Sequence, residues 1–283
     1  MILFRKAVQL SEYLAKKQAS GIDNLLIPTM GALHPGHISL LNSSKAFPGL
    51  RVCSIFVNPT QFNDPSDFKK YPVTLENDIR LLEQHGADIL FLPDVAEMYP
   101  DGMEKLEQYE LGYLESVLEG RFRPGHFQGV CQIMQRLLSI TKPRHLFMGQ
   151  KDYQQCMVVS RLLTILKLGT ELHTVPTLRE TGGLAMSSRN IRLSPQERKN
   201  ALAIYQSLCY LRDQKKPGKL EDQLLFVRKL LEANEFQIDY AVIADSRSLE
   251  TVDIWDGKQP IVALIAAFQH EVRLIDNMLL FES

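Results

Sequence analysis

The fold is decided by residues 25–37, Leu-Leu-Ile-Pro-Thr-Met-Gly-Ala-Leu-His-Pro-Gly-His, in which an apolar run passes into a loop with two glycines. Leu25 to Pro28 has the composition of a buried strand. Gly31 and Gly36 let the following backbone turn and approach a ligand closely, and a helix is expected to begin near Gly36. Because the first N–H groups of a helix attract anions, this stretch predicts a phosphate-binding strand, loop and helix.

The same alternation of strand and helix continues to residue 175. Further strands are expected at 51–57, 87–92, 145–148 and 171–175, with helices at about 127–141 and 152–167. Thr74 is expected to cap another helix, which ends at Gly86. Strands that alternate with helices predict a parallel α/β sheet with right-handed crossovers.

The pattern changes after Pro176. A polar, glycine-containing connection at 177–193 leads to Ser194-Pro-Gln-Glu197, which has the sequence of a capping box with proline in the first turn. A helix is expected at 220–233, followed by strands at 238–244, 261–268 and 272–275. The sequence therefore predicts a smaller C-terminal α+β domain.

Composition excludes several classes of protein. The 283 residues are 45% hydrophobic and 23% charged, which is typical of a globular protein, and 32 basic against 33 acidic residues provide no general attraction to nucleic acid or to a membrane. The longest apolar run, 261–268, has eight residues, whereas a membrane helix needs about 20. Four widely spaced cysteines and charges at Arg5 and Lys6 favour a reduced, cytoplasmic location without a signal peptide. We expect no nucleic-acid partner and no membrane.

Two histidines on the glycine loop are the first candidates for chemistry. His34 and His37 are three residues apart at the expected helix start, so both could face one anion and each could donate an N–H or a full charge. The alternative is that one histidine caps the helix and the other lies on the surface. A zinc site is disfavoured because no third ligand follows the pair.

Two further segments carry donors suited to phosphate. Phe147-Met-Gly-Gln-Lys-Asp152 lies where a strand meets a helix, so Lys151 could reach a phosphate and Asp152 could cap the helix or hold a ribose hydroxyl. The alternative is an ordinary turn with a surface lysine. In 182–190, two serines precede an arginine, and this segment could equally be a flexible linker with a capping serine.

Amide side chains follow the second strand of the predicted sheet. Asn58 and Gln61 could bind a neutral hydroxyl or a carboxylate, and Gln154 and Gln155 could add further amide contacts. The alternative for Asn58 and Gln61 is turn formation alone.

Together these segments resemble the pantoate-beta-alanine ligase family, in the nucleotidyltransferase superfamily marked by a His-x-Gly-His loop. The superfamily loop is shared with cytidylyltransferases and some aminoacyl-tRNA synthetases, whereas Asn-Pro-x-Gln-Phe and Arg-Pro-Gly-His-Phe point to this family. The matching segments are 28–37, 54–59, 61–62, 71–72, 118–120, 123–127, 149–155, 186–190 and 273–277.

The resemblance implies a Rossmann-like ATP- and pantoate-binding domain at 1–177 and a small domain at 178–283 that starts with a closing loop. It implies ATP-dependent ligation of pantoate and β-alanine through a pantoyl adenylate, with release of AMP and pyrophosphate. Mg²⁺ is expected with ATP, and a homodimer is implied.

The resemblance also assigns roles to residues. His37, His34 and Lys151 take the catalytic positions, with His37 as the proton donor. The positions for pantoate and β-alanine are Gln61, Gln155 and Asn58. The ATP positions are Met30, Gly31, Ala32, Leu33, His34, Pro35, Gly36, His37, Gly149, Gln150, Lys151, Asp152, Leu178, Met186, Ser187, Ser188 and Arg189.

Two positions depart from the family pattern. An aspartate usually precedes the last glycine of the closing loop, but here Gly182 stands before Gly183, which should loosen the loop. Of the acidic pair expected near a metal, only Asp78 is acidic and its neighbour is Asn77, so the magnesium ligands stay unassigned.

Three other functions are open on sequence alone. The first is transfer of a nucleotidyl group to a phosphorylated acceptor, for which Arg or Lys would suit the positions of Gln61 and Gln155 better than amides do. The second is nucleotide binding without turnover, which the histidines and Lys151 argue against. The third, a transfer-RNA ligase, should carry a basic surface stripe that this nearly neutral chain does not predict.

Overall fold

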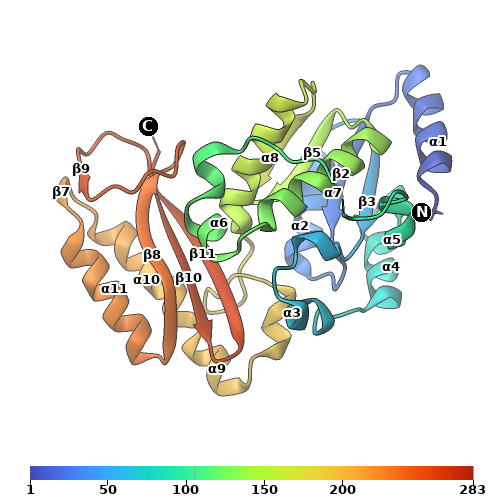
Figure 1. The fold of residues 1–283 in the computed structure, drawn as a ribbon. Coiled ribbons are helices and arrows are strands. Elements are labelled where there is room, and N and C mark those ends of the chain that lie inside the picture. Colours follow the sequence, from blue (N-terminus) through green and yellow to red (C-terminus); the bar gives the residue numbers. More distant parts are fainter. Residues whose placement is uncertain (105, 283) are drawn as a thin grey trace. The chain divides into compact units, whose positions relative to one another are not determined.

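The computed structural model describes residues 1–104 and 106–282, which form two compact units (Figure 1). Unit 1 contains Met1–Gln150 and Gln154–Pro176. Unit 2 contains Lys151–Tyr153 and the chain from Thr177 onward. The short segment Lys151–Tyr153 therefore packs with residues that lie far from it in sequence.

Unit 1 is built on a six-stranded sheet whose paired strands are all parallel, which confirms the predicted α/β class. The strand order is β1-β4-β3-β2-β5-β6, so the strand that enters the glycine loop lies inside the sheet. The strands are β1 (Ile2–Phe4), β2 (Asn24–Thr29), β3 (Leu50–Ile55), β4 (Ile89–Phe91), β5 (His145–Gly149) and β6 (Glu171–Val175).

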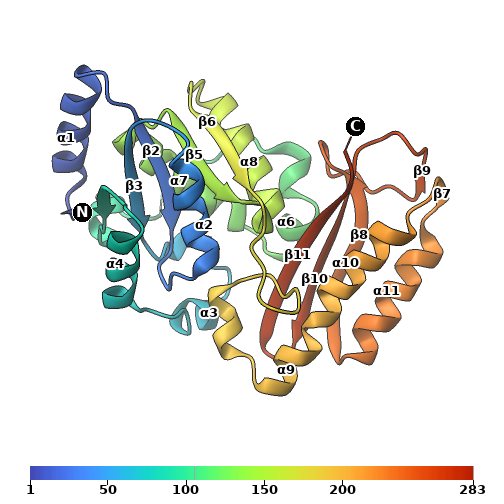
Figure 2. The ribbon, with the colours of Figure 1, turned by 180° about the vertical axis from the view of Figure 1, so that it is seen from behind.

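Helices cover both faces of this sheet (Figures 1 and 2). The helices of this part of the chain are α1 (Ala7–Ala19), α2 (Pro35–Ser44), α3 (Pro65–Lys69), α4 (Leu75–Gln84), α5 (Val95–Met98), α6 (Leu118–Phe122), α7 (His126–Thr141) and α8 (Tyr153–Ile165). Alternate residues of β2 point to opposite faces. Leu26 packs in the core with α1, α7 and α8, whereas Leu25 and Ile27 pack in the core with α2 and α4. Burying each such side chain stabilises the fold by about 1.5 to 3 kcal/mol.

Unit 2 has a three-stranded antiparallel sheet in the order β11-β10-β8, with α10 and α11 on one face (Figure 2). The predicted capping box at Ser194 and Glu197 is confirmed at the start of α9. The elements are α9 (Pro195–Asn200), α10 (Leu202–Gln214), β7 (Gly218–Lys219), α11 (Glu221–Ala233), β8 (Phe236–Asp245), β9 (Ile254–Trp255), β10 (Ile261–Gln269) and β11 (Val272–Phe281).

Several expected elements have different bounds. The strand predicted to reach Val57 ends at Ile55. The Phe56 N–H still donates to Thr29 O, and the chain then enters the turn at Pro59–Gln61. The helix predicted from Asp152 begins one residue later, after the 3₁₀ turn η3 (Gln150–Asp152). Thr74 stands at the N-cap of α4, but its hydroxyl donates to Asp78 instead of accepting from the helix.

Within the described residues, no helix has both the length and the apolar composition needed to cross a bilayer.

Candidate active site

The glycine loop leaves β2 in a conformation that few residues tolerate. Gly31 has φ +82°, and a Cβ there would lie 3.1 Å from Ile55 Cγ2 and 3.2 Å from Asp78 Oδ2. Ala32 follows with φ +48°, which is uncommon for a residue with a side chain. The loop is therefore held by its surroundings in a strained conformation.

Asp78 supplies much of that support. Its carboxylate is buried in α4 and accepts hydrogen bonds from Ala32 N (2.9 Å), Leu33 N (2.8 Å) and the Thr74 hydroxyl (2.9 Å). Hydrogen bonds to an ionised acceptor are about twice as strong as neutral ones. Asp78 thus fixes the main chain just before the histidines, a role that sequence analysis did not predict.

His34 and His37 both take part in the start of α2. His34 is the N-cap residue, and its Nδ1 accepts from Gly36 N (3.1 Å), while His37 Nδ1 accepts from His34 N (3.3 Å). The ring centroids lie 4.0 Å apart. Because both Nδ1 atoms accept hydrogen bonds, each neutral ring carries its proton on Nε2. Both histidines thus take part in capping the helix, and whether the two rings face one anion stays a prediction.

An apolar cavity of about 300 Å³ lies beside this loop in unit 1. Its walls come from the segments that follow β2, β3 and β4 and from the start of α4, so it opens at the carboxyl ends of the parallel strands, where ligands bind in such sheets. Lining residues include Met30, Gly31, Ala32, Ile55, Phe56 and Asp78.

The segment after β3 places Gln61 through a buried hydrogen-bond network. Asn58 is only 1% exposed; its Nδ2 donates to Gln61 Oε1 (3.2 Å) and Gly129 O (3.1 Å), and its Oδ1 accepts from the Tyr99 hydroxyl (2.6 Å). Burial raises the pKa of Tyr99. The Asn58 amide thus bonds inside the protein and positions Gln61, and a direct contact between Asn58 and substrate stays a prediction.

Helix α7 presses closely on the same segment. A Cβ at Gly129 would lie 2.2 Å from Thr60 O, so only glycine allows this approach. His126 Nδ1 donates to Gln61 O (2.7 Å), and Arg123 donates to His126 Nε2 (3.1 Å). The Arg-Pro-Gly-His-Phe segment thus fixes the backbone of Gln61, whose Nε2 lies 3.0 Å from Met30 Sδ on the glycine loop.

The two neighbouring glutamines of α8 have different environments. Gln154 is buried, accepts from Glu119 N (3.0 Å) and donates to Leu114 O (2.7 Å) and Val117 O (2.9 Å). Its amide thus bonds to the protein main chain on both its oxygen and its nitrogen, and a ligand contact of Gln154 stays a prediction. Gln155 is half-buried and points from another side of the helix.

Lys151 belongs to unit 2, where its main chain is anchored. Asn277 Nδ2 donates to Lys151 O (2.9 Å), and Asn277 N donates to Asp276 Oδ1 (2.8 Å). Asp276 is buried in a bidentate ion pair with Arg179 (2.5 and 3.1 Å). Burial raises the pKa of Asp276, and the guanidinium of Arg179 opposes that rise. Lys151 Nζ lies 3.9 Å from Asp152 Oδ1, so the ammonium and its neighbouring carboxylate make only a loose ion pair.

The loop at the start of unit 2 is folded against a tyrosine. Arg179 donates to Gly183 O (3.0 Å) and stacks on Tyr205, 4.5 Å from the ring centroid. A Cβ at Gly183 would lie 1.9 Å from that ring, whereas a Cβ at Gly182 would have ordinary contacts at 3.4 Å. The turn is thus braced around Gly183. Whether Gly182 loosens its closure stays a prediction.

The two serines and the arginine that the sequence predicts as phosphate-binding residues, Ser187, Ser188 and Arg189, follow this turn. Met186 N donates to Leu178 O (3.0 Å), and Ser187 caps the 3₁₀ turn η4 (Ser188–Arg192) by accepting from Arg189 N (3.3 Å). An accepting hydroxyl can still donate its own hydrogen. Asn190 is buried and donates to Glu180 Oε1 (2.8 Å) and Ala185 O (3.0 Å). These two hydrogen bonds hold the segment after Gly183 in place.

The structure thus gathers the predicted residues into two groups. Unit 1 holds the loop from Met30 to His37, Gln61, and Gly149 with Gln150 at the end of the strand next to β2. Unit 2 holds Lys151, Asp152, Leu178 and the segment from Met186 to Arg189. Sequence analysis did not predict the structural roles of Asp78, His126 and the Arg179–Asp276 pair, because they bond to main chain that is distant in sequence.

Comparisons with known proteins are consistent across the whole chain. A model of the pantoate-beta-alanine ligase family matches residues 2–279. A pantothenate synthetase of Cytophaga hutchinsonii is 41% identical over 99% of both chains, and one of Bacteroides fragilis is 43% identical over 91% of both.

Solved structures agree with this similarity. A crystal structure of pantothenate synthetase from Thermus thermophilus has a TM-score of 0.91 at 37% identity and covers both chains completely. A pantoate-beta-alanine ligase from Francisella tularensis, complexed with beta-gamma ATP and β-alanine, has a TM-score of 0.82 at 33% identity over 99% of this chain and 98% of that one. The six-stranded parallel sheet is Rossmann-like, as predicted.

Proposed function

Because this chain belongs to the pantoate-beta-alanine ligase family and is an ATP-dependent ligase, we propose that it joins pantoate to β-alanine through a pantoyl adenylate. In the first step, a pantoate carboxylate oxygen bonds to the α-phosphorus of ATP, and the bond from that phosphorus to the bridging oxygen breaks to release pyrophosphate. In the second, the amine of β-alanine bonds to the acyl carbon, loses a proton, and AMP leaves with the electron pair of the broken C–O bond.

The paired histidines at the start of α2 are the observation that carries this proposal. The first step brings two anions together and adds charge to the leaving pyrophosphate, so it needs donors fixed before the reaction. The capping box orients both imidazoles, with Nε2–H as the donor of each ring. His37 is the proposed proton donor, and His34 the second donor to the phosphates.

The remaining ATP contacts are proposed from both units. In unit 1 they come from the glycine loop, Gly149 and Gln150. In unit 2 they come from Lys151, Asp152, Leu178 and the Met186–Arg189 segment. Lys151 would place a positive charge on a phosphate, and Asn277 supports this by fixing the Lys151 main chain.

Gln61 and Gln155 are the proposed pantoate contacts, with Gln61 also near β-alanine. An amide can accept from the hydroxyls of pantoate and donate to its carboxylate without adding negative charge. This is supported for Gln61 by the network of Asn58, Tyr99 and His126, which sets its position.

Mg²⁺ is proposed to enter with ATP, held by phosphate oxygens and water. Asp78 does not fit as a ligand in this arrangement, because both its oxygens already accept hydrogen bonds from the protein. The homodimer and the cytoplasmic location stay predictions.

The test is pyrophosphate release by purified His37→Ala and His37→Asn in the presence of Mg²⁺, pantoate and β-alanine. The asparagine side-chain oxygen can still accept a hydrogen bond from the His34 N–H, but asparagine lacks the Nε2–H donor. The variant therefore tests the loss of the donor while the helix cap is kept. Loss of this donor should raise the barrier by about 3 to 4 kcal/mol, a hundredfold or more in rate. His85→Ala, at the C-cap of α4, is the matched control.

Three results would overturn the proposal. They are wild-type turnover in both folded His37 variants, pyrophosphate release that does not require pantoate, and a product that retains the nucleotide. The last result would instead support nucleotidyl transfer to an acceptor.

A further inference from the structure

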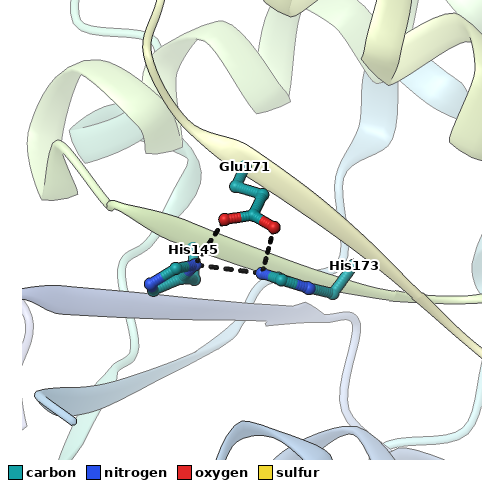
Figure 3. A group of neighbouring side chains, drawn as sticks. All are labelled: His145, Glu171 and His173. Atoms are coloured by element: carbon teal, nitrogen blue, oxygen red, sulfur yellow. Dashed lines mark hydrogen bonds and ion pairs between the residues drawn. The ribbon is translucent and has the colours of Figure 1, made fainter. Parts of the chain in front are cut away.

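Three potential metal ligands meet at the amino ends of β5 and β6 (Figure 3). His145 is the first residue of β5 and pairs in register with Glu171, the first residue of β6. His173 lies two residues further along β6, on the same face as Glu171. The loop that carries the two histidines of the proposed mechanism follows the carboxyl end of β2 in the same parallel sheet. The cluster therefore lies at the opposite, amino-terminal ends of the strands.

The ligand atoms lie near the spacing of a tetrahedral ion. His145 Nδ1 lies 3.0 Å from His173 Nε2 and 3.5 Å from Glu171 Oε2, and His173 Nε2 lies 3.8 Å from Glu171 Oε1. Zinc bonds of about 2.0 to 2.1 Å in a tetrahedron place neighbouring ligand atoms about 3.3 Å apart. The two histidines contact different oxygens of Glu171, and one ligand atom from each residue lies within 4.8 Å of the others. Rotation of the Glu171 carboxylate would therefore bring one oxygen and both nitrogens to one ion.

The two imidazoles are held by aromatic packing. Phe47 lies 4.5 Å from both rings, measured between centroids, and Phe147 stacks on His173 at 4.8 Å. His145 is 9% exposed and His173 19%, whereas Glu171 is 64% exposed. The rings are thus fixed from the protein side, and the carboxylate side is open to a water molecule as a fourth ligand.

We propose that His145, Glu171 and His173 bind one divalent transition-metal ion of the zinc class, which links the edge strand β6 to β5. Two imidazoles and a carboxylate suit Zn²⁺, Co²⁺, Ni²⁺ or Cu²⁺, whereas Mg²⁺ and Ca²⁺ prefer oxygen ligands. The neighbouring cation is Arg144, which is paired with Asp23 at 3.5 Å. The site is separate from the Mg²⁺ expected with ATP.

The experiment titrates the chelator-treated full chain with Co²⁺ near pH 7.5 and follows visible absorption, with Zn²⁺ binding measured by calorimetry. One ion should bind with the intense absorption of four-coordinate cobalt, and Zn²⁺ should raise the Tm. Glu171→Gln, at an exposed position, and His173→Phe, which keeps an aromatic ring, should each weaken binding roughly 100-fold or more and remove the Tm shift. His270→Ala is the control, because His270 and Glu197 form another histidine–carboxylate pair at 3.9 Å.

The proposal is overturned if binding is weaker than millimolar, or if Glu171→Gln binds as tightly as the unchanged chain. It is also overturned if the cobalt absorption disappears in His37→Asn, because the ion would then lie at the catalytic loop. Should His173→Phe fail to fold, the exposed Glu171→Gln variant still decides the outcome.

Discussion

Asp78→Asn should both destabilise unit 1 and slow the reaction. The amide has one accepting oxygen where the carboxylate has two. If that oxygen keeps the bonds from Leu33 N and Thr74, an NH₂ group then faces Ala32 N, which donates at 2.9 Å in the unchanged chain. One charge-assisted bond to a buried N–H is worth about 1.5 to 3 kcal/mol, and the two remaining bonds weaken when the charge is lost. The expected loss of unfolding free energy is therefore about 3 kcal/mol.

The same substitution should reduce kcat about ten- to a hundredfold, because a displacement of about 1 Å in a catalytic group can cost a hundredfold. Urea unfolding gives the stability, and pyrophosphate release with saturating pantoate and ATP gives kcat. Asp213→Asn, on the exposed face of α10, is the matched control and should stay within about 0.5 kcal/mol of the unchanged chain. If Asp78→Asn changes neither quantity by more than this control does, the role assigned to the carboxylate is refuted.

Four further substitutions test three other parts of the structure. Gly183→Ala should cost roughly 2 to 4 kcal/mol, since its Cβ would lie 1.9 Å from Tyr205, whereas Gly182→Ala should cost about 1 to 2 kcal/mol from its positive φ alone; thermal unfolding compares them. Glu97 accepts hydrogen bonds from the Lys6 ammonium and the Ala7 N–H, and these bonds lower the pKa of Glu97 from 4.5. The contribution of Glu97 to folding stability is therefore full above pH 4.5 and is lost as the pH falls through the lowered pKa. Glu97→Gln should therefore cost about 1 kcal/mol at pH 7 and progressively less as the pH falls through the lowered pKa, and a cost that does not change with pH would contradict this assignment. Tyr99→Phe should cost about 1 kcal/mol and raise the KM for pantoate more than it lowers kcat; an unchanged KM would separate Tyr99 from substrate binding.

Local sequence patterns predicted the regular elements because their causes are local. The Ser194 capping box depends on a side chain three residues away, and the buried run at 261–268 depends only on its own composition. By contrast, β1 is a three-residue strand, Ile2–Phe4, that pairs with β4. Its existence depends on a partner almost 90 residues later, so its own sequence does not reveal it.

The candidate site was predictable in residue type but not in the direction of each side chain. Asn58 and Gln61 looked equivalent as amides, yet one is buried as a support and the other lies beside the glycine loop. Gln154 and Gln155 are adjacent in sequence and therefore point from different sides of α8. Asp78 acts on Ala32 and Leu33, which lie more than 40 residues earlier. Such roles follow from packing, which a single sequence does not display.

The contact between Gly129 and Thr60 also limits how this enzyme can change during evolution. A single added methyl group at position 129 of α7 would displace the main chain of Thr60 and Gln61. Consider a saturation mutagenesis screen in which cells must grow without added pantothenate. We expect every substitution of Gly129 to be absent from the surviving cells. From the list of survivors alone, Gly129 would be classified as an active-site residue, although glycine is required there only because a larger residue would collide with Thr60.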